Sequence, residues 1–129
     1  MLILLPPSET KREGGEPGTR LDLASLSFPA LSGARDELVT RVVDLASDVD
    51  ASLAALKLSA KQLPEVERNR ALLEAPVLPS IDRYDGVLYD ALDARSLSSE
   101  ARAFAHQHVL ISSALLGFTR ALDPIPAYR

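Results

Sequence analysis

A stripe of apolar side chains runs through the middle of the chain at intervals of three and four residues. Its members are Leu38, Val42, Leu45, Val49, Leu53 and Leu56. This spacing is one face of a 3.6-residue period and predicts an amphipathic helix over about residues 36–58. Asp36 and Glu37 lie at its amino end, where the helix dipole favours acidic side chains.

Two short runs are apolar at every position instead of alternating. Leu2–Leu5 ends at Pro6-Pro7, and Val109–Ile111 follows a predicted helix. Continuous apolar runs of this length indicate strands buried on both faces, so each is expected to be central in a sheet. Residues 6–20 contain three of the nine prolines and three of the six glycines and are predicted to form a long loop.

Shorter elements follow from capping and breaking signals. Pro64 suits the first turn of a helix, and Ser98 is a suitable cap for another. Pro79 limits residues 77–81 to an edge strand or extended segment, and the prolines of Asp123–Pro126 require extended backbone. The helices predicted on this basis span about residues 64–74, 86–92 and 99–106.

Short strands mixed with helices favour an α+β fold of mixed α/β character. The chain has 129 residues, which suits one domain or part of one. We therefore expect residues 1–129 to belong to a single domain, with the long loop and the amphipathic helix as its main landmarks.

Composition and charge narrow the functional classes. Hydrophobic residues make up 47% of the chain, and a net charge of −4 lowers the expectation of a general nucleic-acid surface. There is no cysteine, which excludes disulfides, thiolate metal sites and a cysteine nucleophile. No stretch reaches the roughly 20 apolar residues of a membrane helix, and Met1–Leu5 lacks the flanks of a signal peptide. A cytoplasmic protein with no membrane partner is expected.

Polar side chains follow directly on the first predicted strand. Ser8, Glu9, Thr10 and Lys11 combine hydroxyls, a carboxylate and an ammonium. Loops beyond the carboxyl ends of parallel strands commonly bind ligands, and these groups suit a phosphate or a polarised carbonyl. The segment lacks the spacing of a P-loop, and a plain polar turn is the alternative interpretation.

A second polar group lies near the end of the sequence. Arginine binds carboxylates and phosphates in a bidentate manner, so an anion site is one interpretation; a structural pair between Arg120 and Asp123 is the other. We predict that both groups line one pocket, which would suit a nucleotide- or nucleobase-binding enzyme. The residues of this second group are Arg120, Asp123, Tyr128 and Arg129.

Four basic residues form a modest cluster around the turn before Pro64. They suit contacts with nucleic-acid phosphates, although Glu65 and Glu67 dilute the charge and a solvated face is the alternative. The cluster consists of Lys57, Lys61, Arg68 and Arg70.

Other reactive residue types lack the neighbours that their chemistry needs. His106 and His108 are two residues apart and have no nearby third ligand, so we expect neither a metal site nor a cofactor. Ser112 and Ser113 end the second buried strand without a nucleophile-elbow motif.

Three segments together resemble the YaaA family of bacterial peroxide-stress proteins. They are the opening MLILLPPSETK (1–11), YDGVLYDAL (84–92), and VLISSALLGFTRALDPIPAYR (109–129). The second is similar to an aromatic-x-Gly-x-x-Tyr-x-x-Leu motif and the third to Ser-x-x-x-Gly-x-x-Arg-Pro-x-Asp…Tyr-Arg. Ala121 stands where the family usually has proline, Leu116 replaces an aromatic residue, and Lys11 is displaced from the position of a lysine in one branch of the family.

The resemblance implies a function and partners. Such proteins are cytosolic, limit oxidative damage by keeping free intracellular iron low, and bind DNA through a helix-hairpin-helix-like element. Because family members continue past the Tyr-Arg pair, the resemblance implies that this chain is an incomplete, N-terminal part of a domain with exposed apolar surface. Expected partners are therefore DNA and a small anionic ligand.

Overall fold

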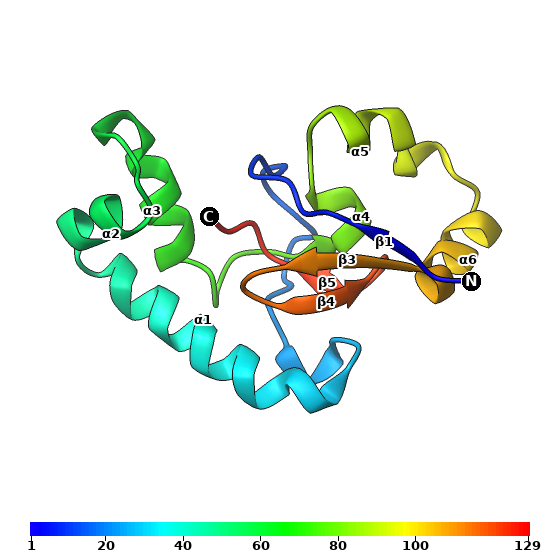
Figure 1. Ribbon diagram of the computed structural model, residues 1–129, viewed down its shortest axis with the longest axis horizontal. Coiled ribbons are helices and arrows are strands. Elements are labelled where there is room, and N and C mark those ends of the chain that lie inside the picture. The colour runs from blue at the N-terminus through cyan, green and yellow to red at the C-terminus, as the bar shows by residue number, and fades with distance from the viewer.

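The computed structural model describes all residues from 1 to 129 and has the predicted α+β fold (Figure 1). The strands are β1 (Ile3–Leu5), β2 (Leu78–Pro79), β3 (Val109–Ser113), β4 (Gly117–Arg120) and β5 (Pro124–Ile125). The α-helices are α1 (Ser32–Ala46), α2 (Val49–Ala55), α3 (Leu63–Arg70), α4 (Ser80–Arg83), α5 (Val87–Leu92) and α6 (Ser99–His108).

The strands form two small sheets. In the first, β1 pairs in parallel with β3, and β3 pairs in antiparallel fashion with β4. In the second, β2 and β5 pair in antiparallel fashion. Because β1 and β3 run in the same direction, the segments that follow Leu5 and Ser113 leave the sheet at the same end. That end is where the candidate site lies.

The first strand differs from its prediction. A strand forms at residues 3–5, but it is the edge strand of the order β1-β3-β4 and is not central. Leu2 and Leu4 are exposed by 61% and 62%, whereas Leu5 packs against the core. The apolar run identified a strand, but the number of its neighbours depends on distant segments, and β1 has a hydrogen-bonded partner on one side only.

The predicted helix over residues 36–58 is two helices. The chain breaks at Ser47-Asp48, where the Asp48 carboxylate accepts a hydrogen bond of 3.0 Å from the backbone N–H of Ala51 and caps α2. The turn lets the second half of the apolar stripe face a small cluster of its own with α3. That helix starts at Leu63 and ends at Arg70, four residues before the predicted end. The cluster consists of Ala46, Leu53, Leu56, Leu58 and Val66.

Most of the shorter elements agree with prediction. Ser98 caps α6 by accepting from the N–H of Ala101, and β3 is buried. Residues 6–20 form a loop without helix or strand. Strand β4 was not predicted, because Gly117 and the residues after it give no alternating pattern.

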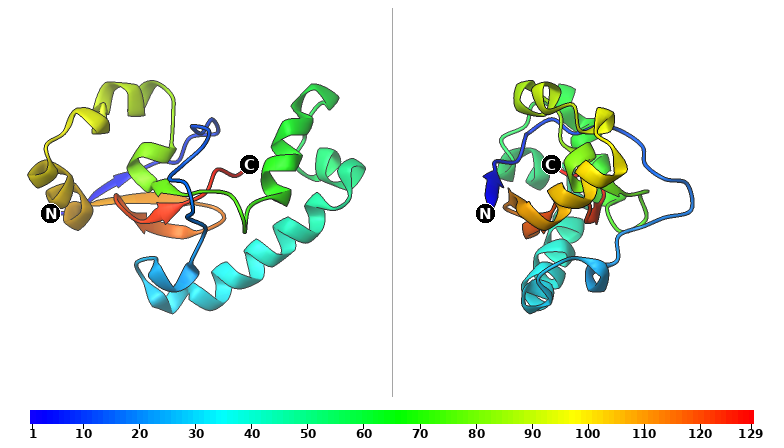
Figure 2. Two further views of the ribbon diagram at one scale, coloured as in Figure 1. Left: turned by 180° about the vertical axis from the view of Figure 1, so that it is seen from behind. Right: turned by 90° about the vertical axis from the view of Figure 1, so that its right-hand side faces the viewer.

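Three helices stand on one side of the sheets and two on the other. In Figure 1 and in the left view of Figure 2, α1, α2 and α3 extend away from the strands, while α5 and α6 lie toward the opposite end. The main core lies between, with Tyr84, Ile111, Leu116 and Ile125 fully buried. None of the helices combines the length and the apolar composition that a membrane span requires.

One buried arginine joins the helical side to the sheet. Arg35 of α1 is 1% exposed, and its guanidinium donates to the carbonyls of Leu116 (2.7 Å), Ser27 (2.8 Å) and Phe118 (2.8 Å). These carbonyls belong to the β3–β4 hairpin and to the loop before α1. Burial lowers the pKa of Arg35, and its hydrogen bonds compensate for the lost hydration.

Candidate functional site

The loop after β1 is held in an extended course beside the end of α4. The Arg12 N–H donates to the Arg83 carbonyl (2.8 Å), and the Asp85 N–H donates to the Thr10 carbonyl (3.2 Å). Lys11 and Tyr84 form an isolated antiparallel bridge between these hydrogen bonds. The Ser8 hydroxyl accepts from the Asp85 N–H (3.0 Å), so the loop is fixed at several successive residues.

Arg83 supplies the second anchor of this loop. Its guanidinium is fully buried and donates to four carbonyls. Burial is the main cause of its lowered pKa, and the nearby positive charge of Arg68 lowers it further. The loop therefore follows a fixed path across the carboxyl end of the sheet. The accepting carbonyls are those of Arg12 (2.7 Å), Gly14 (2.9 Å), Pro76 (3.1 Å) and Ile125 (3.1 Å).

Lys11 is the centre of the candidate site. Its side chain is buried, and Nζ donates to the carbonyls of Ser8 (2.9 Å) and Glu9 (3.0 Å). Nζ also lies 4.3 Å from the centroid of the Tyr128 ring, in a cation–π arrangement. Burial lowers the pKa of Lys11 to about 8, since the attraction of Glu65 does not compensate for the lost hydration.

Three hydroxyl groups form a chain beneath Lys11. Tyr84 Oη lies 2.7 Å from Tyr128 Oη, which lies 2.7 Å from Ser113 Oγ. Burial raises the pKa of both tyrosines. Ser113 Oγ also accepts from the N–H of Leu116, and Tyr84 Oη has no other partner. Three hydroxyl hydrogens serve two hydrogen bonds within the chain, so one hydrogen is left to donate whichever groups act as donors.

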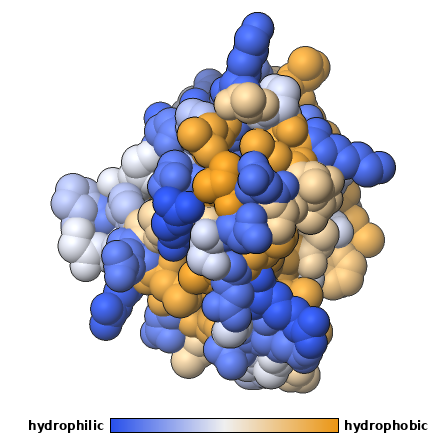
Figure 3. Space-filling view, turned by 90° about the vertical axis from the view of Figure 1, so that its left-hand side faces the viewer, coloured by the Kyte–Doolittle hydropathy of each residue, from blue (hydrophilic) through white to orange (hydrophobic).

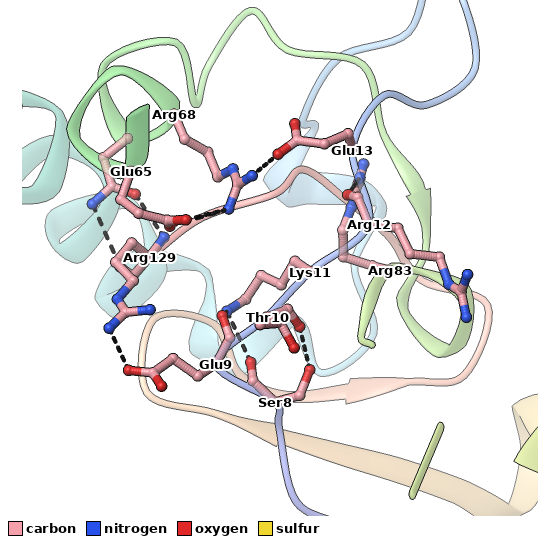
Figure 4. Close-up of polar contacts among 11 residues, drawn as sticks. Ser8, Glu9, Thr10, Lys11, Arg12, Glu13, Glu65, Arg68, Arg83 and Arg129 are labelled. Atoms are coloured by element: carbon pink, nitrogen blue, oxygen red, sulfur yellow. Dashed lines mark hydrogen bonds and ion pairs between the residues drawn. The ribbon is translucent and has the colours of Figure 1, made fainter. Parts of the chain in front are cut away.

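Two arginines flank the lysine, as Figure 4 shows. The Arg129 guanidinium forms an ion pair with Glu9. The Arg68 guanidinium pairs with Glu65 at 3.0 Å and also with Glu13. Together with Lys11 they place three cationic side chains on one region of the structure, which is the chemistry that binds phosphate or carboxylate anions.

The backbone of the last residue is fixed by α3. The Arg129 N–H donates to Asn69 Oδ1 (2.8 Å), and Asn69 Nδ2 donates to the Arg129 carbonyl (3.4 Å). Asn69 is 3% exposed. This reciprocal pair sets the direction in which Arg129 leaves the core.

The structure brings together four of the seven residues predicted to bind a ligand. Ser8, Lys11, Tyr128 and Arg129 lie within one connected set of contacts. Thr10 is exposed on the same loop. The ligand-binding role of all of these residues remains a prediction.

Arg120 and Asp123 lie at the other end of the sheet. Arg120 is paired with Leu110 in the β3–β4 register, whereas Ser113, at the site, is paired with Gly117. The Arg120 guanidinium donates to the Gln107 carbonyl (3.0 Å) and stacks over Phe28. Asp123 accepts from the Arg120 N–H (2.9 Å) and from both the N–H and the hydroxyl of Ser27. A pocket shared by these two residues and the loop after β1 is therefore not present.

The four residues of the predicted basic cluster divide into two pairs. Arg68 turns toward the Lys11 site, and Arg70 pairs with Glu67 and donates to the Ala46 carbonyl. Lys57 and Lys61 are exposed, and their side-chain ammonium groups make no hydrogen bond or ion pair. They lie in the connection between α2 and α3, residues 56–62, which we name the α2–α3 tip.

The α2–α3 tip is a tight turn. Lys57 adopts a left-handed backbone conformation (φ 54°), which a residue with a side chain rarely takes. The Ser59 N–H donates to Gln62 Oε1 (3.0 Å), and this starts the next helical turn. Figure 3 shows this end of the molecule as a mixture of hydrophilic and hydrophobic surface. Leu63, the first residue of α3, is exposed by 40%.

Several residues of the site did not stand out in the sequence as members of one cluster. Glu65 and Asn69 both lie on α3. Glu65 pairs with Arg68 on the same face of the helix, whereas Asn69 contacts Arg129, which is 60 residues away in the sequence. Tyr84 was noted only as part of the segment 84–92 and Ser113 only as a hydroxyl at the end of a strand, and neither was assigned to this site. One signal could have assigned Ser113 to the site: it ends a buried strand that is parallel to β1, so it lies at the same end of the sheet as the loop after β1.

The histidines make local contacts. His106 Nδ1 accepts from the Leu122 N–H (3.1 Å), and His108 Nδ1 lies 2.8 Å from the Met1 carbonyl. No group of three or more His, Asp and Glu side chains in the structure is placed to hold a metal ion.

Comparison with known proteins identifies relatives along the whole chain. The family model described as "Peroxide stress protein YaaA" matches residues 1–129. A UPF0246 protein of Corynebacterium glutamicum is 52% identical over 129 residues, and one of Corynebacterium efficiens is 50% identical over the same length. A UPF0246 protein of Streptomyces coelicolor is 43% identical over 130 residues. In each case 100% of this chain and 50% of the relative are covered, so the chain spans about half the length of these relatives.

Proposed function

The chain belongs to the YaaA family of peroxide stress proteins, and from this membership we propose that it acts in the response to hydroperoxides. Its role is to keep free iron low in the cytoplasm and to bind DNA. Iron that is not bound reacts with hydrogen peroxide to give hydroxyl radicals, which damage DNA. Lowering free iron and binding DNA would therefore both protect DNA. The proposal for DNA rests on the geometry of the α2–α3 tip.

The α2–α3 tip suits a phosphate backbone. Lys57 and Lys61 are exposed and unpaired, and the short connection places both beside the first turn of the next helix. Half or more of protein–DNA hydrogen bonds go to phosphate and sugar, and helix starts and lysines supply many of them. The strained backbone at Lys57 also supports a functional role, since such strain is concentrated at binding sites.

A titration of labelled duplex DNA at increasing salt tests this proposal. Two phosphate contacts at the tip contribute about 2 to the slope of log K against log salt. The double variant Lys57→Ala/Lys61→Ala is expected to lose that part of the slope and to bind at least about tenfold more weakly at low salt.

The matched control is Arg20→Ala/Arg95→Ala, which removes the same charge from two exposed arginines elsewhere. Equal losses in both double variants would mean that net charge alone governs binding. The absence of binding at low salt would remove the DNA proposal altogether.

The iron proposal has its own measurement. Electron paramagnetic resonance of chelated iron in cells, with and without the protein, is expected to show less free iron when the protein is present during peroxide treatment. An unchanged signal would contradict this part of the role and leave the DNA titration as a separate result.

A second candidate function is binding of a nucleotide or another small anion at the Lys11 site. The observation that favours it is the convergence of Lys11, Arg68 and Arg129 beside a hydroxyl chain with a hydrogen left to donate. Ser8→Ala and Arg129→Gln are expected to weaken nucleotide binding in calorimetry and to leave the melting temperature nearly unchanged. Binding equal to that of the unmodified protein in both variants would remove this candidate.

A further inference from the structure

The ion pairs of the Lys11 site are asymmetric. The side chains of Arg68 and Arg129 are exposed by only 14% and 18%. The carboxylates that meet them from outside, Glu13 and Glu9, are exposed by 79% and 73%. The arginine side chains are therefore mostly buried, whereas their outer partners are long side chains that lie mostly in solvent.

Arg68 keeps a second side-chain partner when Glu13 is removed, and Arg129 keeps its backbone anchor when Glu9 is removed. The Arg68 guanidinium is held by both carboxylate oxygens of Glu65, at 3.0 and 3.1 Å. The Arg129 backbone is held by Asn69 on both its N–H and its carbonyl. Removal of Glu13 would leave the Arg68 guanidinium held by Glu65, and removal of Glu9 would leave the Arg129 guanidinium without a carboxylate partner at the same backbone position.

The site holds more fixed positive than fixed negative charge. Lys11, Arg68, Arg83 and Arg129 are near enough to one another to interact, since Arg68 lowers the pKa of both Lys11 and Arg83, and Arg129 lowers the pKa of Arg68, each in addition to a larger effect of burial. Glu65 is the only acid of the cluster that is mostly buried. Of the three positive charges that remain after Glu65 is counted, the exposed Glu9 and Glu13 offset two.

A hollow opens directly beside one of these outer pairs. It has a volume of about 270 Å³ and is bordered by Glu13 and Arg68. The rest of its wall is uncharged and largely apolar, with Pro64, Pro76 and Ala127 among its members. The hollow therefore offers one guanidinium, paired with one exposed carboxylate, next to a largely apolar surface.

We propose that Glu9 and Glu13 occupy the positions of ligand anions, and that a phosphorylated small molecule displaces them. The phosphate group replaces the Glu13 carboxylate on Arg68 and the Glu9 carboxylate on Arg129, and an apolar body of the ligand fills the hollow. This inference rests on the second candidate function and specifies its ligand class. The phosphate chemistry has two possible sources, a free phosphate ester or the backbone of DNA, and the experiment separates them.

The displacement has a small energetic cost. Exposed ion pairs contribute little to stability, because water solvates both groups well and the long side chains lose entropy on pairing. A phosphate ester offers more negative charge and more acceptor oxygens than a carboxylate, in the bidentate geometry that arginine favours. Binding would convert two weak ion pairs into stronger ones.

Calorimetric titration with inorganic phosphate and with phenyl phosphate tests the proposal. Because each glutamate competes with the ligand, Glu9→Gln and Glu13→Gln are expected to bind phenyl phosphate about two- to fivefold more tightly than the unmodified protein. Arg68→Gln is expected to bind it at least about tenfold more weakly. Phenyl phosphate is expected to bind more tightly than inorganic phosphate, because only the ester fills the hollow.

Glu100→Gln is the matched control, since it removes the same charge from an exposed residue of α6. Its affinity for phenyl phosphate is expected to stay within about 1.5-fold of the unmodified protein. An equal gain in Glu100→Gln, or weaker binding in Glu9→Gln and Glu13→Gln, would overturn the proposal. These glutamine variants lose only exposed ion pairs, so a failure to fold does not obscure the result.

Two further outcomes separate this inference from the proposals on which it builds. If the unmodified protein binds nucleotides but Glu9→Gln and Glu13→Gln bind them no more tightly, the proposal that a ligand displaces these glutamates is wrong. The second candidate function, anion binding at the Lys11 site, is then still supported. If Glu9→Gln and Glu13→Gln strengthen binding of duplex DNA and leave phenyl phosphate unchanged, the source of the phosphate is nucleic acid and the small-molecule proposal is overturned.

Discussion

The ammonium of Lys11 lies 4.3 Å from the centroid of the Tyr128 ring, and this contact joins the loop after β1 to the end of the chain. The two residues are far apart in sequence, and each is held by other contacts: Lys11 by two carbonyls and Tyr128 by two hydroxyls. A charged group in such surroundings is stabilised by few water molecules. Its protonation should therefore affect the stability of the whole fold.

The first prediction concerns the pH dependence that Lys11 causes. The pKa of Lys11 is about 8 in the folded protein and 10.5 in an unfolded chain. Between these values the unfolded chain binds more protons, so the free energy of unfolding rises with pH. Relative to Lys11→Met, the unmodified protein is expected to gain about 1 to 2 kcal/mol between pH 8 and pH 10.

Urea denaturation of both proteins at several pH values provides the measurement. Taking the difference between them cancels the titration of all other groups, and the difference should be constant below about pH 7. A difference that does not change up to pH 10 would show that burial does not lower the pKa of this lysine.

The second prediction concerns the hydroxyl chain. Tyr128→Phe keeps the ring over Lys11 but removes the hydroxyl between Tyr84 and Ser113. Because the buried Tyr84 hydroxyl then has no partner, we expect a loss of about 1 to 3 kcal/mol in the free energy of unfolding. Tyr89→Phe, which removes one hydrogen bond to the Pro6 carbonyl, is the comparison and should cost less. Equal costs in denaturant titrations would contradict a special role for the chain.

Local patterns in the sequence predicted the elements whose signals are themselves local. Ser98 was identified as the cap of α6, and Pro64 as part of the first turn of α3, because capping depends on residues three or four positions away. The break at Asp48 was missed for a related reason. The apolar stripe continues across it, and only packing against α3 shows that the second half of the stripe faces a separate cluster.

The candidate site was only partly predictable. The two predicted polar groups meet at Lys11 and Tyr128, but only Lys11 lies in the loop after one of the parallel strands, whereas Tyr128 follows β5 of the second sheet. The same prediction placed Arg120 with them and failed, because the unpredicted strand β4 returns the chain to the opposite end of the sheet. The anchoring role of Arg83 depends on carbonyls from four separate segments, and no pattern in the sequence indicates those.

The third prediction concerns the break between α1 and α2. Asp48→Ala removes the cap on the N–H of Ala51 and is expected to cost about 1 kcal/mol. Asp44→Ala is the control: this exposed acid lies in the last turn of α1, where the helix dipole disfavours it, so its removal should be neutral or slightly stabilising. Thermal melts of the two variants should therefore shift in different directions. A shift in the same direction and of the same size would contradict the capping role.

The last prediction concerns the arginine that joins α1 to the β3–β4 hairpin. Arg35→Leu removes the guanidinium that donates to one buried and two partly buried carbonyls, of which those of Leu116 and Phe118 belong to the hairpin. Each unsatisfied buried acceptor costs about 1 to 3 kcal/mol, and partial relaxation reduces the sum, so we expect a loss of at least about 3 kcal/mol.

Arg41→Leu on the same helix is the matched control for Arg35→Leu. Arg41 is exposed and makes one ion pair with Glu37 a single turn away, so its removal should change the free energy of unfolding by less than about 0.5 kcal/mol. Urea denaturation of both variants separates the two roles. If Arg35→Leu costs no more than Arg41→Leu, the hairpin does not depend on α1 for its position, and strand β4 must be held by its pairing with β3 alone.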